Sequence, residues 1–247
     1  DALLPHQPHP EIRVNRVTVL HRHIGRCNLC GWPVIRWSNH VFGNRCIRCL
    51  STQIHRAAGF AVDSLRLSTD SRVYELSSRG ALFHFLKKRF RNFYYSDYFD
   101  DVPPGGNKNG VLCQDVQNLS LPEDTFDLVT STEVFEHVPD DMKAFSEIRR
   151  VLRPGGWLVF TVPLAENATT VERAFPMPGG GVNHVLTPEY HSDRIRGTGK
   201  VLAYRNYGRD ITDRLRSAGI VSEIRTITSE RSMVASRSVV LGNKEPV

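Results

Sequence analysis

The sequence predicts an α/β domain that follows a small cysteine-rich module, and three observations lead to this prediction. Beyond residue 70, short apolar runs typical of buried strands alternate with helical segments that carry apolar residues on one face. Two Cys-x-x-Cys pairs stand before residue 50. The formal net charge of +6 arises within residues 1–60, where eight arginines are set against only two acidic residues. We therefore divide the chain into a basic module at residues 1–60 and a larger domain at residues 61–247.

The paired cysteines of the module have the spacing of a structural zinc site. Cys27 and Cys30 form one pair, Cys46 and Cys49 form the second, and fifteen residues separate the two pairs. Two such pairs predict a tetrahedral Zn²⁺ site with Zn–S bonds of ~2.3 Å, and four protein ligands leave no position open for a substrate. Disulfides or a redox dithiol are the alternatives. No stretch resembles a secretion signal, which argues against disulfides, and the second matched pair argues against a single redox motif.

The basic charge of the module permits two interpretations. Arginines accompanied by tryptophans can bind nucleic acid or an anionic substrate, or they can form a solvated face that keeps the module soluble. The residues concerned are Arg13, Arg16, Arg22, Arg26, Arg36, Arg45, Arg48, Arg56, Trp32 and Trp37. Residues 1–10 hold three prolines, which disfavour a helix, so we expect an extended segment there.

The elements of the larger domain follow in order from the apolar pattern. Strands are expected at residues 71–76, 93–95, 110–113, 127–131, 157–162, 221–228 and 238–242. Helices are expected to begin at residues 80, 139 and 209. Asp140 and Asp141 suit the start of the second helix, because its unpaired N–H groups and its dipole favour negative charge. The Arg-Pro-Gly-Gly run at residues 153–156 ends that helix, and residues 165–206 show no regular pattern.

One stretch of this domain carries a family pattern. Residues 114–163 contain the runs LPEDTFDLV, EHV and VLRPGG in that order. The pattern resembles the class I S-adenosylmethionine-dependent methyltransferases of the small-molecule type, and the resemblance covers about residues 68–243. It implies that residues 61–247 are a methyltransferase domain, with a Rossmann-like sheet of seven strands, an antiparallel last strand and flanking helices. A segment as long as residues 165–206, placed above the ends of the strands, is typical of a lid or substrate loop.

The resemblance also implies where S-adenosylmethionine binds. The glycine-rich loop of the family corresponds to residues 75–80, in which Ser77 and Ser78 replace glycines and Gly80 remains. The serines either crowd the cofactor or hydrogen-bond its carboxylate, and the alternative is a pocket that has lost cofactor binding. The acid that ends the second strand takes the ribose hydroxyls, because a carboxylate accepts two hydrogen bonds at once. Asp97 is the first choice for that acid, with Asp100 and Asp101 as rivals.

A second part of the cofactor site follows the third strand. In the family an aspartate here accepts a hydrogen bond from the adenine amino group, and the next backbone N–H reaches a ring nitrogen. Asp115 and Val116 occupy these positions, and the alternative for Asp115 is a helix or turn cap. The full set that the resemblance implies for the cofactor is Glu75, Ser77, Ser78, Gly80, Asp97, Asp115, Val116 and Thr132.

Methyl transfer from a sulfonium is an in-line displacement, so the first task of such an enzyme is alignment. Orientation can contribute ~7–11 kcal/mol, whereas a general base adds ~10²–10⁴-fold and is optional for a nucleophilic acceptor. The candidate bases are His137, with Glu133 and Glu136 beside it, and His184 and His191 in the insert. For His137 the alternative is a residue of the pocket wall. For the two insert histidines it is loop scaffolding, or metal binding together with Glu189 and Asp193.

We therefore expect a cytoplasmic, S-adenosylmethionine-dependent methyltransferase that acts on an O or N atom of a small-molecule or saccharide-type acceptor. An RNA methyltransferase that binds RNA through its basic zinc module is the alternative. A non-catalytic zinc-dependent interaction protein with a decayed cofactor pocket is the third possibility. No apolar run approaches the ~20 residues of a membrane span.

Overall fold

The computed structural model describes residues 24–38, 42–192 and 199–245. The extended segment expected at residues 1–10 lies outside the described residues, as do Arg13, Arg16, Arg22 and Asp193. Among the helices of the described part, none has the length and apolar character needed to cross a membrane.

The larger domain is built on one sheet of eight strands, in the order β16-β17-β9-β8-β4-β5-β7-β6. Five neighbouring strands run parallel, and β17 runs antiparallel to both β9 and β16. Their bounds are β4 (Arg72–Glu75), β5 (Asn92–Asp97), β6 (Asn107–Lys108), β7 (Val111–Cys113), β8 (Phe126–Thr132), β9 (Leu152–Thr161), β16 (Val221–Ser229) and β17 (Val234–Asn243). This arrangement confirms the predicted α/β sheet with an antiparallel last strand.

The sheet has one strand more than the seven predicted. β6 pairs antiparallel with β7, with Lys108 opposite Val111. The two residues between the strands, Asn109 and Gly110, both have positive φ, at 53° and 81°. An Asn-Gly pair with this backbone is the favoured two-residue hairpin turn. From the sequence only one strand, at residues 110–113, was expected here.

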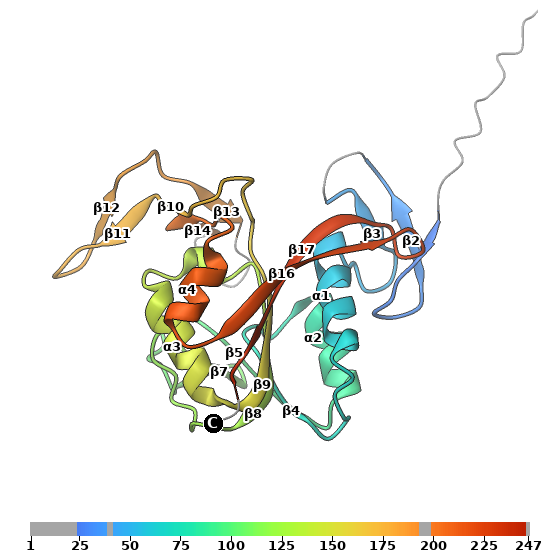
Figure 1. The fold of residues 1–247 in the computed structure, drawn as a ribbon, viewed down its shortest axis with the longest axis horizontal. Helices are drawn as coiled ribbons and strands as arrows, with labels where there is room; N and C mark the ends of the chain where they lie inside the picture. The colour runs from blue at the N-terminus through green and yellow to red at the C-terminus, as the bar shows by residue number, and fades with distance from the viewer. Residues whose placement is uncertain (1–23, 39–41, 193–198, 246–247) are drawn as a thin grey trace, which may run out of the picture.

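Helices cover both faces of the sheet (Figure 1), namely α1 (Gln53–Ser64) and α2 (Gly80–Arg89) on one face, and α3 (Asp141–Val151) and α4 (Ile211–Ser217) on the other. The alternation of strand side chains explains two separate cores. On β8, Leu128 packs with the α1 and α2 core, whereas the next residue, Val129, packs with the α3 and α4 core. The start of α3 agrees with the prediction, because the Asp140 side chain accepts a hydrogen bond from the Lys143 N–H at 3.0 Å.

The N-terminal module is a small antiparallel sheet that packs on the larger domain through α1. Its strands are β1 (Gly25–Arg26), β2 (Pro33–Arg36) and β3 (Asn44–Cys46). The predicted boundary between residues 60 and 61 lies inside α1, a helix that the sequence analysis did not identify. The turn between β16 and β17 reaches the module, where Met233 joins a core with Cys27, Val34 and Cys46.

Arg56 neither binds a ligand at the surface nor forms part of a solvated face, the two roles that its charge suggested. Its side chain is fully buried on α1, so it is not part of a solvated or nucleic-acid-binding face. The guanidinium donates to the Ser51 carbonyl oxygen at 2.6 Å, in the module, and to the Ser232 carbonyl oxygen at 2.8 Å, in the β16–β17 turn. These bonds satisfy the buried charge and join the module to the last hairpin.

The described part of residues 165–206, a segment expected to be irregular, forms three two-stranded ladders. β10 (Val171–Glu172) pairs with β15 (Arg205–Asn206), β11 (Ala174–Pro176) pairs with β12 (Val182–His184), and β13 (Tyr190–Ser192) pairs with β14 (Lys200–Leu202). Each strand is two or three residues long, which is too short to show a periodic pattern in the sequence. Figure 1 shows this insert above α3 and α4, with the β11–β12 hairpin projecting outward.

Candidate functional site

A cavity of about 260 Å³ lies at the carboxyl ends of the parallel strands. The strand order reverses between β4 and β8, which is the place where open α/β sheets bind ligands. The lining combines carboxylates with apolar and aromatic side chains. It consists of Tyr74, Leu76, Ser96, Asp97, Tyr98, Asp100, Gln114, Asp115, Val116, Gln117, Val134, His137, Val138, Pro139 and Tyr204.

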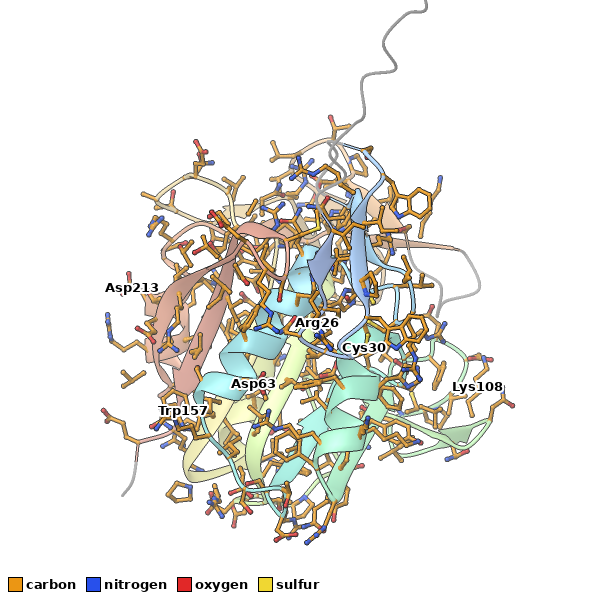
Figure 2. The ribbon with its side chains drawn as sticks, turned by 90° about the vertical axis from the view of Figure 1, so that its right-hand side faces the viewer. Arg26, Cys30, Asp63, Lys108, Trp157 and Asp213 are labelled. Carbon is orange, nitrogen blue, oxygen red and sulfur yellow. The ribbon has the colours of Figure 1, made fainter. Side chains whose placement is uncertain are left out.

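Asp97 ends β5 and lines the cavity, although its carboxylate is already engaged by the neighbouring loop. Ser78 donates to it twice, from the backbone N–H at 3.3 Å and from the hydroxyl. One of the two replacement serines therefore holds the acid in place. Of the two rivals, Asp100 lines the cavity, whereas Asp101 is exposed and pairs with Lys108 at 2.6 Å. Figure 2 shows Lys108 at the margin of the molecule.

Asp115 forms the turn that was the alternative to a cofactor role, and it also lies at the cavity. Its carboxylate accepts from the Gln117 backbone N–H at 2.9 Å and from the Gln117 side-chain amide at 3.0 Å, as in an Asx turn. The same residue lines the cavity together with Val116. The turn thus fixes a carboxylate at the cavity wall instead of leaving it mobile.

Five residues of the implied cofactor set do not line the cavity: Glu75, Ser77, Ser78, Gly80 and Thr132. Glu75 is fully buried at the end of β4, where the Thr130 hydroxyl donates to it. Burial is the main cause that raises the pKa of Glu75 to about 8, and the nearby Asp97 carboxylate adds to the rise. Gly80 begins α2 with a φ of +95°, a conformation that suits glycine.

The cavity contains groups that suit a nucleoside. Asp97, Asp100 and Asp115 offer acceptors for hydroxyl and amino groups, and Leu76 and Val134 offer apolar surface for a flat ring. Ten lining residues were absent from the predicted set, among them the polar or aromatic Tyr74, Tyr98, Gln114, Gln117 and Tyr204. Gln114 and Gln117 flank Asp115 and could have been included for that reason, but nothing in the sequence marked Tyr204, which comes from the insert.

Two of the three predicted histidines lie together beside the cavity. The rings of His137 and His191 are 4.8 Å apart and nearly perpendicular, and Glu136 lies next to both. Burial, followed by the nearby Glu133 carboxylate, raises the pKa of Glu136 well above its usual value. His184 does not join this group, because it is exposed on β12.

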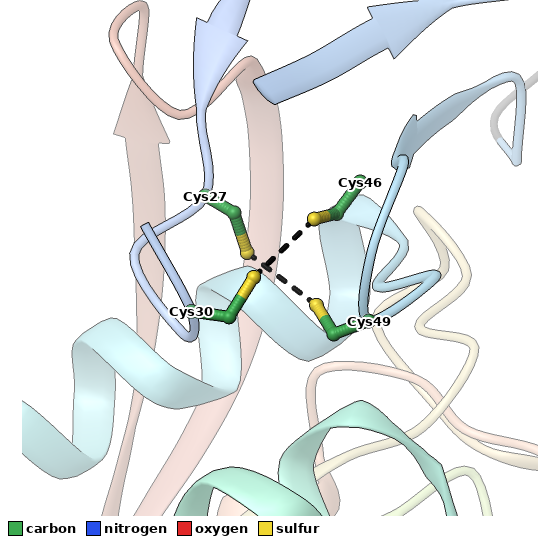
Figure 3. Close-up of side chains that lie close together, drawn as sticks. All are labelled: Cys27, Cys30, Cys46 and Cys49. Atoms are coloured by element: carbon green, nitrogen blue, oxygen red, sulfur yellow. Dashed lines mark hydrogen bonds between the residues drawn. The ribbon is translucent and has the colours of Figure 1, made fainter. Parts of the chain in front are cut away.

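The four cysteines of the module converge as a metal site requires (Figure 3). Cys27 Sγ lies 3.7 Å from Cys49 Sγ, and Cys30 Sγ lies 3.4 Å from Cys46 Sγ. All four sulfur atoms lie within 4.8 Å of one another. Sulfur atoms bound at ~2.3 Å to one tetrahedral ion stand about 3.8 Å apart, whereas disulfide sulfurs stand at ~2.05 Å. The geometry fits a tetrahedral ion, and the fifth cysteine, Cys113, is buried in the larger domain.

The pattern at residues 114–163 overlaps a longer match between this chain and a known protein family. Residues 77–160 match the methyltransferase domain family. A phthiotriol/phenolphthiotriol dimycocerosates methyltransferase of Mycobacterium ulcerans is 30% identical over 98 residues, which cover 37% of this chain and 36% of that protein. A ubiquinone biosynthesis O-methyltransferase of Coxiella burnetii is 37% identical over 49 residues, or 20% of this chain and 21% of that protein. The chain thus spans about a third or less of the curated relatives it matches.

The fold is also similar to that of a solved structure. A chain in the complex between the Haloferax volcanii Trm112 methyltransferase activator and the putative methyltransferase aligns with a TM-score of 0.50 and 17% identity. The alignment covers 78% of this chain and 90% of that chain. This likeness concerns the fold, and it agrees with the Rossmann-like sheet described above.

Proposed function

We propose that this chain, whose residues 77–160 match the methyltransferase domain family, transfers a methyl group from S-adenosylmethionine to an O or N atom of a small-molecule or saccharide-type acceptor. The observation that carries this proposal is the cavity at the strand ends, with Asp97 and Asp115 on its wall. The curated relative named as a ubiquinone biosynthesis O-methyltransferase supports an oxygen target.

The cofactor would be held by groups that already have fixed positions. Asp97, positioned by Ser78, would accept the ribose hydroxyls, and Asp115, positioned by Gln117, would accept the adenine amino group. Fixed acceptors lose little freedom when a ligand binds, so more of the interaction energy appears as affinity. Ser77, in the loop before α2, and Gly80, the first residue of α2, would contact the methionine part of the cofactor.

The acceptor would lie on the side of the cavity formed by His137 and by Tyr204 of the insert. Alignment of the acceptor with the transferable methyl group would be the main catalytic effect, because orientation contributes more than a base. His137 is the best placed of the three histidines to contact the acceptor, since it alone among them lines the cavity. We further propose that the cysteine quartet binds one structural Zn²⁺ and that the protein acts in the cytoplasm.

Calorimetry with S-adenosylmethionine and with S-adenosylhomocysteine tests the proposal directly. Folded, zinc-loaded protein should bind both with a stoichiometry close to one. If neither compound binds, methyl transfer is refuted, and the non-catalytic interpretation suggested by Ser77 and Ser78 takes its place.

RNA as the acceptor is a second candidate, because the described part of the module presents cations and aromatic rings together. Arg26, Arg36, Arg45 and Arg48 are exposed, as are Trp32 and Trp37. The Arg48 guanidinium lies 5.1 Å from the centre of the Trp32 ring. Retention on an RNA column, with a steep salt dependence that is lost in an Arg36→Gln, Arg45→Gln, Arg48→Gln variant, would favour RNA. Weak retention, unchanged in that variant, would favour the small acceptor.

A further inference from the structure

Glu136 is a buried carboxylate that the proposed function leaves unexplained. Its side chain is about 1% exposed, and neither carboxylate oxygen has a hydrogen-bond partner among the described residues. Burial of a carboxylate without compensation is costly, so such groups are normally paired or coordinate a metal. The residue follows β8, in the short helix η1 (Phe135–His137), at the edge of the cavity.

The ring of His137 is oriented so that one nitrogen faces this carboxylate. Nδ1 lies 2.9 Å from the Leu202 carbonyl oxygen, which can only accept, so Nδ1 carries the proton. In the neutral ring Nε2 then carries the lone pair, and Nε2 lies 3.5 Å from Glu136 Oε1. A metal-binding histidine typically donates its other N–H to a carbonyl or a carboxylate in this way.

His191, which belongs to the insert, faces the same Glu136 oxygen with its Nδ1 atom, whereas His137 faces it with Nε2. Its Nε2 lies 3.1 Å from Glu189 Oε1, and its Nδ1 lies 3.9 Å from Glu136 Oε1. Glu189 is in turn held by Arg173 at 3.3 Å. The Glu189 carboxylate can accept a hydrogen bond from His191 Nε2, which leaves Nδ1 with the lone pair on the side of Glu136. In many metal sites a histidine donates one ring N–H to a carboxylate and binds the metal ion through its other ring nitrogen.

We propose that Glu136, His137 and His191 bind a divalent transition-metal ion beside the cavity. Their three ligand atoms lie within 4.8 Å of one another. Ligands bound at ~2.0–2.1 Å to one ion stand about 3.0–3.4 Å apart, so side-chain shifts of about 1 Å or less bring the donors to bonding distance. Two imidazoles and one carboxylate suit zinc, iron, cobalt or manganese. The positive charge of the ion would compensate the negative charge of the buried Glu136 carboxylate.

The site also has a place in the proposed reaction. His137 lines the cavity, and three protein ligands leave coordination positions for oxygen atoms of an acceptor. A hydroxyl or carboxylate of the acceptor would then bind the ion and be oriented by it. This last step rests on the proposed function, whereas metal binding itself does not.

Titration with Mn²⁺, followed by electron paramagnetic resonance, tests the site in the absence of any cofactor. Dialysis against a mild chelator should leave one zinc per chain, in the cysteine quartet, so that the second site is empty at the start. We expect one further equivalent of Mn²⁺ to bind, and we expect Glu136→Gln or His191→Ala to abolish this binding. Glu189→Ala should weaken it by about 10–100-fold, the usual effect of losing such a second partner. His184→Ala, which changes an exposed histidine of the same insert, is the matched control and should bind as the natural chain does.

Two results would overturn the proposal. One is the absence of bound Mn²⁺ in the natural chain under these conditions, together with failure of Zn²⁺ or Co²⁺ to bind beyond the first equivalent. The other is Mn²⁺ binding that Glu136→Gln and His191→Ala leave unchanged while circular dichroism shows both variants folded. Separate calorimetry with S-adenosylhomocysteine shows whether the cofactor site itself is intact, so failure of the metal site and failure of the methyltransferase proposal can be told apart.

Discussion

Arg205 donates a hydrogen bond from Nη1 to the carbonyl oxygen of Val138 at 2.5 Å. The same guanidinium donates to the Pro139 carbonyl oxygen at 2.8 Å and to the Glu172 carboxylate at 3.1 Å, and its side chain is about 3% exposed. Val138 and Pro139 line the cavity. One buried side chain of the insert therefore holds the loop that forms the cavity wall, so the position of the insert and the shape of the site depend on each other.

Replacement of Arg205 by methionine should strongly destabilise the protein. The substitution keeps an unbranched side chain but leaves the buried carbonyl groups of Val138 and Pro139 without their donor, and Glu172 keeps only Arg214 as a partner. Loss of one member of a buried pair costs about 3–5 kcal/mol. Urea unfolding measures this change. Arg216→Ala is the control, because Arg216 pairs with Asp213 where both side chains are more than two-thirds exposed. It should cost about 1 kcal/mol or less. Equal effects of the two substitutions would show that the anchor is unimportant.

Replacement of Asp115 by alanine should weaken binding of S-adenosylhomocysteine by about 1–3 kcal/mol, or roughly 5- to 150-fold, because a buried donor of the ligand loses its acceptor. Isothermal titration calorimetry measures the dissociation constant. Asp101→Ala, an exposed carboxylate of the same domain outside the cavity lining, should leave it unchanged. Unaltered affinity in the Asp115 variant would mean that the cofactor lies elsewhere.

Replacement of Cys30 by serine should remove the zinc from the module and destabilise the whole chain, because zinc binding contributes directly to the folding of such modules. Metal analysis should find about one zinc per chain in the natural protein and a small fraction of that in the variant. Cys113→Ala is matched in chemistry but lies in the larger domain, so it should keep its zinc. Full zinc content in the Cys30 variant would exclude a four-sulfur site.

Stability should fall as the pH rises through neutrality because of Glu75. Burial raises its pKa in the folded protein to about 8, above the ordinary value of 4.5. The folded state therefore holds the proton more tightly, and the associated stability is complete below about pH 4.5 and lost as the pH passes about 8. Melting temperatures between pH 5 and 9 should decline less steeply for Glu75→Gln than for the natural chain. Parallel declines would indicate that Glu75 titrates normally in the folded protein.

Local patterns explain which parts could be predicted from the sequence. The start of α3 at Asp140 follows from a capping side chain beside an amphipathic run, and the cysteine spacing identifies four residues that do converge. Glu136 and His191, in contrast, meet only because short ladders fold the insert back over η1. These residues are 55 positions apart and are brought together by strands of two or three residues, so no periodic pattern in the sequence could predict their contact. For the same reason the sequence suggested a surface role for Arg56, whose partners at Ser232 and Met233 lie near the other end of the chain.

The packing of Met233 in the core of the module affects when the module can fold during translation. The paired cysteines leave the ribosome before residues 231–233, which supply part of their packing through Met233 and through a hydrogen bond from the Arg26 backbone N–H to the Arg231 carbonyl oxygen at 2.6 Å. During translation the module therefore cannot complete its core until residues 231–233 have been made. A nascent chain that stalls before residue 231 would expose its thiols and its unfinished core together, so we expect truncated products to be poorly protected from oxidation and proteolysis.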